Sequence, residues 1–316
     1  MKLLLAWPQL NEAHVETIQQ ETGAVLLRPA DKDELPELVE HAEVIFGYIK
    51  PELLIRAVRC RWMQIPFAGV EKVLAVPWGN PDMFLTNGSG IFGPNIAEHV
   101  IGMMLAFNRG LHIARDYQHK RQWRWDEPYP FRELTDSVVG ILGFGDIGQH
   151  VAQRLAAFGC RIIGFRTQPR GDEQYVEAVY RLDEVDNHLD KLDYVVCALP
   201  HTNKTVGFLN RARLAKMPKH AVVINVGRGS LIPEEDLYEA LSQGVIAGAG
   251  LDVLPEEPLP ADSRLWDLPN LILSPHNSGY TPYHADRALE IFLDNWQSFI
   301  RVGRPHRNVI DPEKWY

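Results

Sequence analysis

The chain has 316 residues, of which 46% are hydrophobic and 23% charged, a length that predicts two globular domains with large cores. Its formal net charge of −9 argues against a general nucleic-acid binder, and no apolar run is long enough to span a membrane. The three cysteines are widely separated and odd in number, so we expect a reducing cytoplasm, no disulfide framework and no metal.

Strand and helix patterns alternate from the N-terminus. Short apolar runs predict strands, and amphipathic or proline-started segments predict helices. This alternation indicates a parallel sheet covered by helices. The expected strands are 2–6, 24–27, 44–47 and 84–87, and the expected helices are 11–22, 34–41 and 51–59.

A longer helix is expected over residues 93–115, where apolar side chains recur at helical spacing, as in a core or an interface. The segment 118–129 then mixes basic and aromatic side chains without periodicity. We expect it to form a protein interface, and stacking on nucleic acid is the alternative that the acidic chain disfavours. The two sets are Ile96, Val100, Met103, Met104, Phe107 and Leu111, and His119, Lys120, Arg121, Trp123, Arg124, Trp125 and Tyr129.

A glycine motif joins an expected buried strand, 138–142, to an expected amphipathic helix, 149–158. Gly143, Gly145 and Gly148 have the spacing G-x-G-x-x-G that binds dinucleotides when it lies between a strand and a helix. Gly143 would make the turn, Gly145 would let the pyrophosphate approach the backbone, and Gly148 would let the helix pack closely. The alternative is an ordinary strand-turn-helix.

Mostly apolar strands continue beyond this motif, as expected for a sheet covered on both faces. Polar stretches follow three of them, at the carboxyl ends where open α/β sheets bind ligands. The strands are 161–165, 194–200, 221–226, 247–253 and 271–274, the polar stretches are 225–230, 252–260 and 274–279, and a last helix is expected over 282–302.

These motifs, in this order, resemble the D-isomer-specific 2-hydroxyacid dehydrogenases, and the resemblance runs from residues 67–70 to 303–309. It implies two doubly wound parallel-sheet domains, Rossmann- or flavodoxin-like, with a cleft between them. It also implies a homodimer. The expected parts are a substrate domain of residues 1–98 and 285–316, a dinucleotide-binding domain of residues 99–284, and a dimerisation arm of residues 100–132.

The resemblance assigns catalysis to Arg228 of N-V-x-R-G, Glu257 before the proline of D-V-x-x-x-E-P, and His276 of S-P-H. The chemistry agrees, because reducing a 2-oxo acid needs a cation for the carboxylate and carbonyl and a proton donor for the alkoxide. A guanidinium suits the first task, and a histidine beside a carboxylate suits the second. The alternatives are a loop-capping arginine, a solvated carboxylate and a packed histidine.

Other positions contact substrate or cofactor by the same resemblance. The backbone amides of Ala68, Gly69 and Val70 would bind the substrate carboxylate, beside a Phe67 that is larger than usual in the family. The histidine motif continues unusually with Asn277 and Ser278. Besides the glycines, the expected cofactor contacts are Asp146, Ile147, Leu199, Pro200, Thr205, Val226, Asp252 and Ser278.

The residues that follow the strand 161–165 indicate which nicotinamide cofactor is preferred. NAD-preferring sites carry an acid about 20 residues beyond the glycines. Here Arg166 lies 166 − 148 = 18 positions after Gly148, and no carboxylate appears before Asp172. Arg166, Thr167 and Arg170 would bind a 2′-phosphate, so we expect NADP, with NAD as the second cofactor. The alternative is a pair of solvated loop arginines.

The leading hypothesis is a reductase of small 2-oxo acids such as glyoxylate or hydroxypyruvate. A dehydrogenase for a bulkier D-2-hydroxy acid, or one of the formate or phosphite type, is the enzymatic alternative. In formate dehydrogenases the position that corresponds to Glu257 resembles Gln, so Glu257 favours the hydroxyacid chemistry. A corepressor that keeps this fold as a nucleotide-sensing scaffold would be the non-enzymatic alternative.

Overall fold

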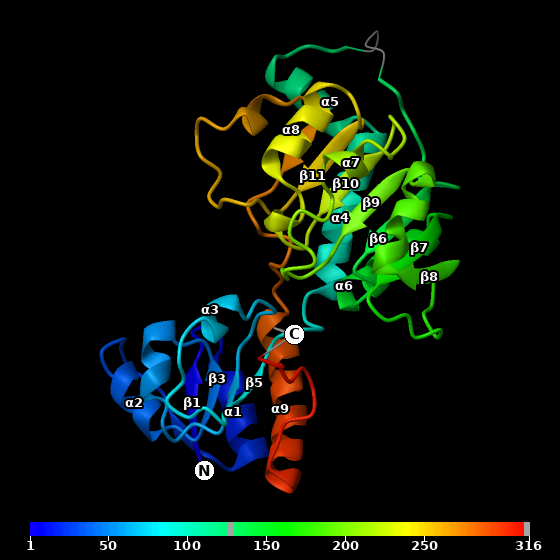
Figure 1. The fold of residues 1–316 in the computed structure, drawn as a ribbon. Helices are drawn as coiled ribbons and strands as arrows, with labels where there is room; N and C mark the ends of the chain where they lie inside the picture. Colours follow the sequence, from blue (N-terminus) through cyan, green and yellow to red (C-terminus); the bar gives the residue numbers. More distant parts are fainter. Residues whose placement is uncertain (125–128, 313–316) are drawn as a thin grey trace. The chain divides into compact units, whose positions relative to one another are not determined.

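A computed structural model describes residues 1–124 and 129–312. The chain divides into two compact units, Met1–Ile91 with Thr281–Tyr316, and Phe92–Tyr280. Each is built around one parallel sheet (Figure 1), which confirms the two expected parallel-sheet α/β domains. Trp125 of the aromatic segment and residues 313–316 of the expected substrate domain lie outside the described residues.

The first unit has a five-stranded sheet in the order β2-β1-β3-β4-β5. Its strands are β1 (Lys2–Ala6), β2 (Val25–Leu27), β3 (Val44–Gly47), β4 (Trp62–Gln64) and β5 (Phe84–Thr86). Its helices are α1 (Glu12–Thr22), α2 (Leu35–His41), α3 (Glu71–Leu74) and α9 (His284–Val302), with a 3-10 turn over Pro51–Arg56.

The last helix, α9, completes the first unit through an aromatic stack. The ring of Phe292 lies 4.3 Å from that of Phe46 on β3 and 5.1 Å from that of Trp62 on β4, centroid to centroid. Gln64 adds polar contacts, because its side-chain amide donates to the carbonyl of Ala288 at 3.2 Å and accepts from Asn295 at 3.1 Å. A segment far along the chain therefore covers the N-terminal sheet.

The second unit has a seven-stranded sheet in the order β12-β11-β10-β9-β6-β7-β8. Its chain runs outward from β6 through β7 to β8 and then returns to the other side of β6 as β9, so the switch point lies between β6 and β9. The strands are β6 (Val138–Leu142), β7 (Arg161–Arg166), β8 (Ala178–Arg181), β9 (Tyr194–Cys197), β10 (Val222–Asn225), β11 (Gly248–Leu251) and β12 (Leu271–Leu273).

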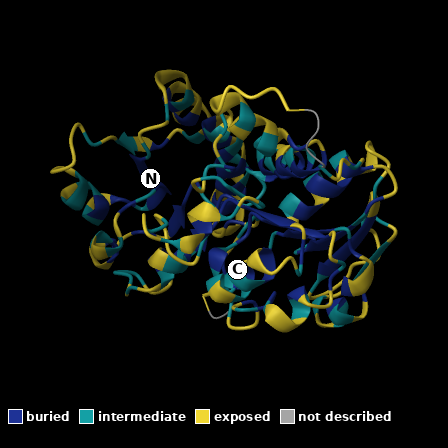
Figure 2. Ribbon diagram, turned by 90° about the horizontal axis from the view of Figure 1, so that it is seen from above, coloured by how far each residue is buried: buried dark blue, intermediate teal, exposed yellow. Residues whose placement is uncertain are grey.

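Helices cover both faces of this sheet, and its strands are mostly buried (Figure 2). Alternate residues of β9 enter opposite cores: Tyr194 belongs to the core that contains Val100 of α4, and Val195 belongs to the core that contains Leu237 of α8. The helices are α4 (Gly93–Asn108), α5 (Leu111–His119), α6 (Asp146–Ala156), α7 (Arg211–Leu214) and α8 (Glu234–Ser242). The 3-10 turns are Leu182–Asn187, Leu189–Lys191, Gly229–Leu231 and Arg264–Asp267.

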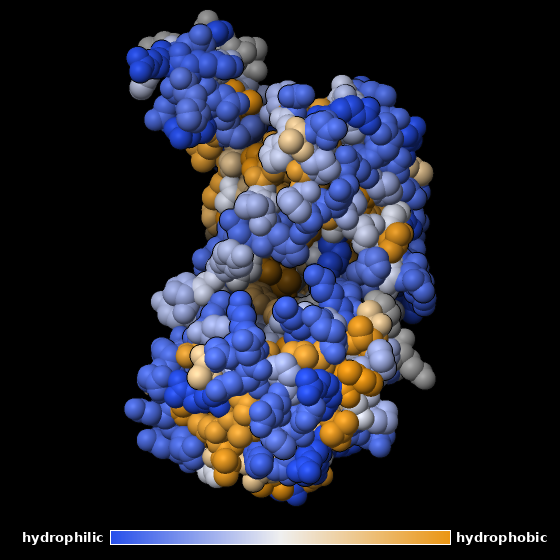
Figure 3. Space-filling view, turned by 90° about the vertical axis from the view of Figure 1, so that its left-hand side faces the viewer, coloured by the Kyte–Doolittle hydropathy of each residue, from blue (hydrophilic) through white to orange (hydrophobic). Residues whose placement is uncertain are grey.

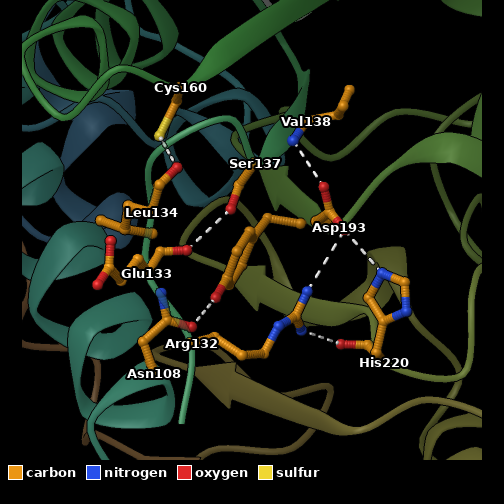
Figure 4. A network of polar contacts seen from close by, with 10 residues as sticks. Asn108, Arg132, Glu133, Leu134, Ser137, Val138, Cys160, Asp193 and His220 are labelled. Carbon is orange, nitrogen blue, oxygen red and sulfur yellow. Dashed lines mark hydrogen bonds and ion pairs between the residues drawn. The ribbon is translucent and has the colours of Figure 1, made fainter.

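A polar network fixes the end of the expected arm to the sheet (Figure 4). Asp193, just before β9, accepts the backbone N–H of Val138 at 2.7 Å and contacts His220 Nε2 at 2.7 Å. Arg132 lies 3.4 Å from the same carboxylate and donates to the backbone carbonyl of His220 at 2.7 Å. The network joins the arm to the starts of β6 and β9.

Two predicted helices differ from the structure, and one strand was not predicted. The helix expected over 93–115 is two helices, α4 and α5, because Gly110 between them has φ of 61°. The helix expected over 51–59 is a 3-10 turn that ends at Arg56. Strand β8 was missed because it is an edge strand whose residues are only partly buried.

No helix among the described residues is both apolar and long enough to cross a bilayer. In the view of Figure 3, hydrophilic residues cover most of the surface and apolar residues appear as separate patches.

Candidate active site

The turn from β6 into α6 is closed by two glycines. Gly143 has φ of 97°, and a Cβ there would lie 2.5 Å from the carbonyl oxygen of Ala198. At Gly148 a Cβ would lie 2.5 Å from the carbonyl oxygen of Gly143. Any side chain at either position would collide with backbone, so the glycines let the helix start directly on the strand.

The first turn of α6 is suited to a pyrophosphate. Gly145 precedes the helix, and a Cβ there would meet no atom within 4 Å, so a ligand can reach its backbone. The opening N–H groups of an α-helix have no acceptor within the helix and attract anions. Asp146 and Ile147 lie in this turn, and Ile147 is partly buried against the core. These residues fit a dinucleotide.

The loop after β9 carries three expected cofactor contacts. Leu199 is buried, whereas Pro200 is exposed. The Thr205 hydroxyl donates to the carbonyl of Pro200 at 2.6 Å and accepts the N–H of Thr202 at 2.8 Å. Thr205 thus shapes the turn that presents Leu199 and Pro200. Val226, after β10, is also buried.

Arg228 lies in a loop that follows β10 and is held by backbone packing. The side chain of Asn225 donates to the carbonyl of Arg228 at 3.0 Å. A Cβ at the next residue, Gly229, would come within 1.9 Å of the carbonyl carbon of Leu254. The arginine is half-buried, and its loop touches the segment after β11 that carries Glu257.

Glu257 and His276 form a hydrogen-bonded pair. Oε1 of Glu257 accepts the N–H of Leu254 at 2.9 Å, and Oε2 lies 2.7 Å from Nδ1 of His276. His276 has φ of 52°, a left-handed backbone that is uncommon outside glycine. The side chains are 36% and 53% exposed, so the pair is open to a substrate, and Nε2 is left for proton transfer.

A buried carboxylate holds the histidine loop in place. The Asp252 side chain is 1% exposed and accepts the Ser274 hydroxyl at 2.6 Å. It also accepts the N–H groups of Asn277 at 3.0 Å and Ser278 at 3.1 Å, together with the Ser278 hydroxyl. Asp252 and Ser278, both expected to contact cofactor, contact each other. The unusual Asn277 and Ser278 are donors to this carboxylate.

Helix α4 supplies two residues that sequence reasoning missed. His99 Nε2 lies 2.9 Å from the Ser274 hydroxyl, and the Asn95 side chain donates to the carbonyl of Ser278 at 2.8 Å. A signal existed, because His99 lies four residues before Met103 on the apolar stripe of this helix. A histidine on a buried face indicates a polar partner across the packing surface.

The arginines expected to read the cofactor lie beside α6. Arg166 and Arg170 line a hollow of about 560 Å³ together with Asp146, while Thr167 is exposed. Glu173 lines the same hollow, with Oε1 3.5 Å from Nη1 of Arg166. Sequence reasoning did not assign this glutamate a role.

The expected carboxylate-binding loop of the first unit follows β4. The Asn87 side chain donates to the carbonyl of Ala68 at 2.8 Å. Ala68 is exposed, Gly69 is partly buried and Val70 is buried. Phe67 packs edge-on against Tyr48, with 5.2 Å between ring centroids.

Comparisons with known proteins identify the family to which the chain belongs. The model of the D-isomer specific 2-hydroxyacid dehydrogenase NAD binding domain matches residues 101–278. The glyoxylate reductase of Pyrococcus furiosus is 30% identical over 309 residues, which cover 93% of this chain and 88% of that protein.

Solved structures extend the likeness to the whole chain. A D-isomer specific 2-hydroxyacid dehydrogenase family protein from Aeromonas salmonicida superposes with a TM-score of 0.85 and 34% identity, covering 98% of this chain and 99% of that one. The NADPH-dependent glyoxylate/hydroxypyruvate reductase of Sinorhizobium meliloti, solved with NADP and sulfate, superposes with a TM-score of 0.83 and 29% identity, covering 100% of this chain and 99% of that one. The fold is that of nicotinamide-dependent oxidoreductases. The chain belongs to the D-isomer-specific 2-hydroxyacid dehydrogenase family.

Proposed function

We propose that the protein reduces a small 2-oxo acid, of the glyoxylate or hydroxypyruvate type, to the D-2-hydroxy acid. NADPH is the preferred reductant and NADH the second. The observation that carries the proposal is the pair of His276 and Glu257, 2.7 Å apart, at the carboxyl edge of the sheet that also presents Arg228. A reduced nicotinamide cofactor held at the turn of Gly143, Gly145 and Gly148 would supply a hydride for the substrate carbonyl carbon.

The chain's own groups supply the proton and the charge. Glu257 contacts Nδ1 of His276 and orients the ring, so that Nε2 is the atom that donates a proton to the oxygen that becomes the hydroxyl. Arg228 binds the carboxylate and the polarised carbonyl with its planar fork. We further propose that the backbone amides of Ala68, Gly69 and Val70 bind a carboxylate.

Two aromatic residues favour a small substrate. Phe67 precedes the proposed carboxylate loop, and its ring is fixed against Tyr48 at 5.2 Å. A fixed aromatic ring at this position would leave little room for a long side chain on the substrate.

Two basic side chains favour NADPH. Arg166 and Arg170 line the hollow beside α6, where a 2′-phosphate would meet two permanent positive charges, and Thr167 would add a hydroxyl donor. The Sinorhizobium meliloti relative is NADPH-dependent.

Initial rates with a panel of 2-oxo acids test the proposal, each measured with NADPH and with NADH. We expect kcat/KM to be highest for glyoxylate or hydroxypyruvate with NADPH, and the product to be the D-isomer where it is chiral. Faster turnover of a branched 2-oxo acid would favour the bulky-substrate alternative. Cofactor binding without turnover of any acid would favour the corepressor alternative.

We also propose a homodimer formed through the arm of residues 100–132, in a cytoplasmic enzyme. Helix α5 in this arm buries none of its side chains in the single chain, and Trp123 is 86% exposed. Light scattering should find a dimer that Trp123→Lys weakens. Met104, on the apolar stripe of α4, is not suited to this test because it is fully buried in the core of its own unit. A wild-type monomer at assay concentration would contradict the proposal.

A further inference from the structure

Glu173 is enclosed by the loop to which it belongs. Its Oε1 accepts the backbone N–H of Arg170 at 2.7 Å, and its Oε2 accepts that of Gly171 at 2.7 Å. The side chain is 4% exposed. Gly171 has φ of 87°, so the loop makes a tight turn around the carboxylate. The N–H of Arg170 holds the pKa of the Glu173 carboxyl below its ordinary value, and the group is therefore ionised at neutral pH.

The same carboxylate faces the guanidinium of Arg166. Nη1 of Arg166 lies 3.5 Å from Oε1 of Glu173, and the arginine side chain is 19% exposed at the end of β7. A guanidinium has five N–H donors, so one contact with Glu173 leaves others for a ligand. The carboxylate of Glu173 thus contacts both arginine residues of the loop, Arg166 through the arginine side chain and Arg170 through the arginine backbone N–H.

We propose that Glu173 is a positioning residue for the 2′-phosphate of NADP, setting Arg166 and Arg170 in the hollow where that phosphate is bound. The inference rests on the proposed preference for NADPH. It assigns the geometry of the phosphate site to an acidic side chain that does not itself bind the cofactor. The side chain is 4% exposed, and each carboxylate oxygen accepts a backbone N–H group of its own loop, so the carboxylate faces the loop and not the solvent.

Charge alone would give Glu173 the opposite effect. A carboxylate beside a phosphate site repels the phosphate, so its removal would tighten NADPH binding if electrostatics dominated. If positioning dominates, removal weakens NADPH binding, because the loop loses two hydrogen bonds to an ionised group and Arg166 loses its partner. The direction of the change therefore separates the two roles.

Asp172 is the matched control. It lies next to Glu173, lines the same hollow and is exposed. Asp172→Asn removes one negative charge without removing the hydrogen bonds that Glu173 makes. Glu173→Ala removes both charge and acceptors, and Glu173→Gln keeps the shape but loses the charge and one acceptor.

The measurement is the Kd of NADPH and of NADH, titrated by nucleotide fluorescence on the full-length protein. We expect Glu173→Ala to raise the Kd of NADPH about tenfold, Glu173→Gln to raise it less, and both to leave the Kd of NADH within about twofold. Asp172→Asn should leave NADPH binding unchanged or tighter. If Glu173→Ala does not fold, Glu173→Gln decides alone.

Tighter NADPH binding in either Glu173 variant, an unchanged Kd, or an equal loss for both nucleotides would overturn the inference. Arg166→Asp tests the underlying proposal separately, since it should reverse the preference by about 10- to 150-fold. If Arg166→Asp changes nothing, the NADPH preference itself is wrong. If it reverses the preference while the Glu173 variants bind NADPH normally, only the role of Glu173 is wrong.

Discussion

The histidine loop 274–278 and the cofactor loop 166–173 use the same device in different ways. In each, a carboxylate with little or no exposed surface accepts the backbone N–H groups of a functional loop. Asp252, which holds the histidine loop, lies directly after β11, at the carboxyl edge of the sheet. Glu173, which holds the cofactor loop, belongs to the loop itself. The loop of His276 is thus fixed by a residue next to a core strand, whereas Arg166 and Arg170 are fixed by a local turn.

Replacing the reactive group should give the largest effect. We expect His276→Ala to lower kcat for reduction by about 10²–10⁴-fold, the usual size of general acid catalysis, and to leave the Kd of NADPH almost unchanged. Single-turnover rates and nucleotide titration on the same preparation separate the two quantities. Turnover close to wild type in the folded variant would remove His276 from the mechanism.

Removing the carboxylate that anchors the histidine loop should have the next largest effect. Asp252→Asn replaces an ionised acceptor of four donors, and each hydrogen bond to a charged group contributes about 1.5–3 kcal/mol. We expect a lower free energy of unfolding and a lower kcat together, measured by denaturant titration and steady-state kinetics.

Ser278→Ala is the control for that variant, because it removes one donor and keeps the carboxylate. It should lie between the wild type and Asp252→Asn in both measurements. If Asp252→Asn lowers kcat with no loss of stability, then Asp252 acts on the ligand and does not anchor the loop.

Glu257→Gln tests the partner of the histidine and should have a more moderate effect. The amide has one acceptor oxygen where the carboxylate has two, so either Nδ1 of His276 or the N–H of Leu254 loses its present acceptor. We expect kcat for reduction to fall, but by less than in His276→Ala, in steady-state assays at saturating NADPH. A kcat equal to that of the wild type would mean that Glu257 only supports its loop.

The smallest effect is expected at His188, a buried histidine in the second unit. It packs against Phe165 of β7 and Tyr180 of β8, and burial lowers its pKa. The unfolded chain binds a proton at a higher pH than the folded one, so His188 costs stability as the pH falls below about 6.5. When the pH is lowered from 7 to 5, the range in which histidine titrates, the free energy of unfolding of His188→Phe should fall less than that of the wild type. Parallel losses in the two proteins would contradict this.

Local chemistry explains why much of the site could be predicted. The turn of Gly143 and Gly148 follows from the strand and helix beside it. Arg228 and His276 could be assigned because each follows an apolar strand within a family motif. Each of these signals lies within a few residues of the position that it concerns.

The remaining residues depend on packing between distant segments. Nothing near His99 in the sequence shows that α4 passes Ser274, and nothing near Glu173 shows that the loop folds back to Arg166. The break at Gly110 was missed because apolar periodicity continues across it to Leu111. Periodicity records which face is buried and does not record the backbone angle of one glycine.

The place of α9 has a consequence for how the chain is made. Phe46 and Trp62 are synthesised early, but Phe292, which stacks on both, follows only after the whole of the second unit. Domains generally fold as units during synthesis, so the central unit is able to fold on the ribosome while the N-terminal sheet still lacks its last helix. The N-terminal sheet is therefore the part of the nascent chain that most needs protection from aggregation.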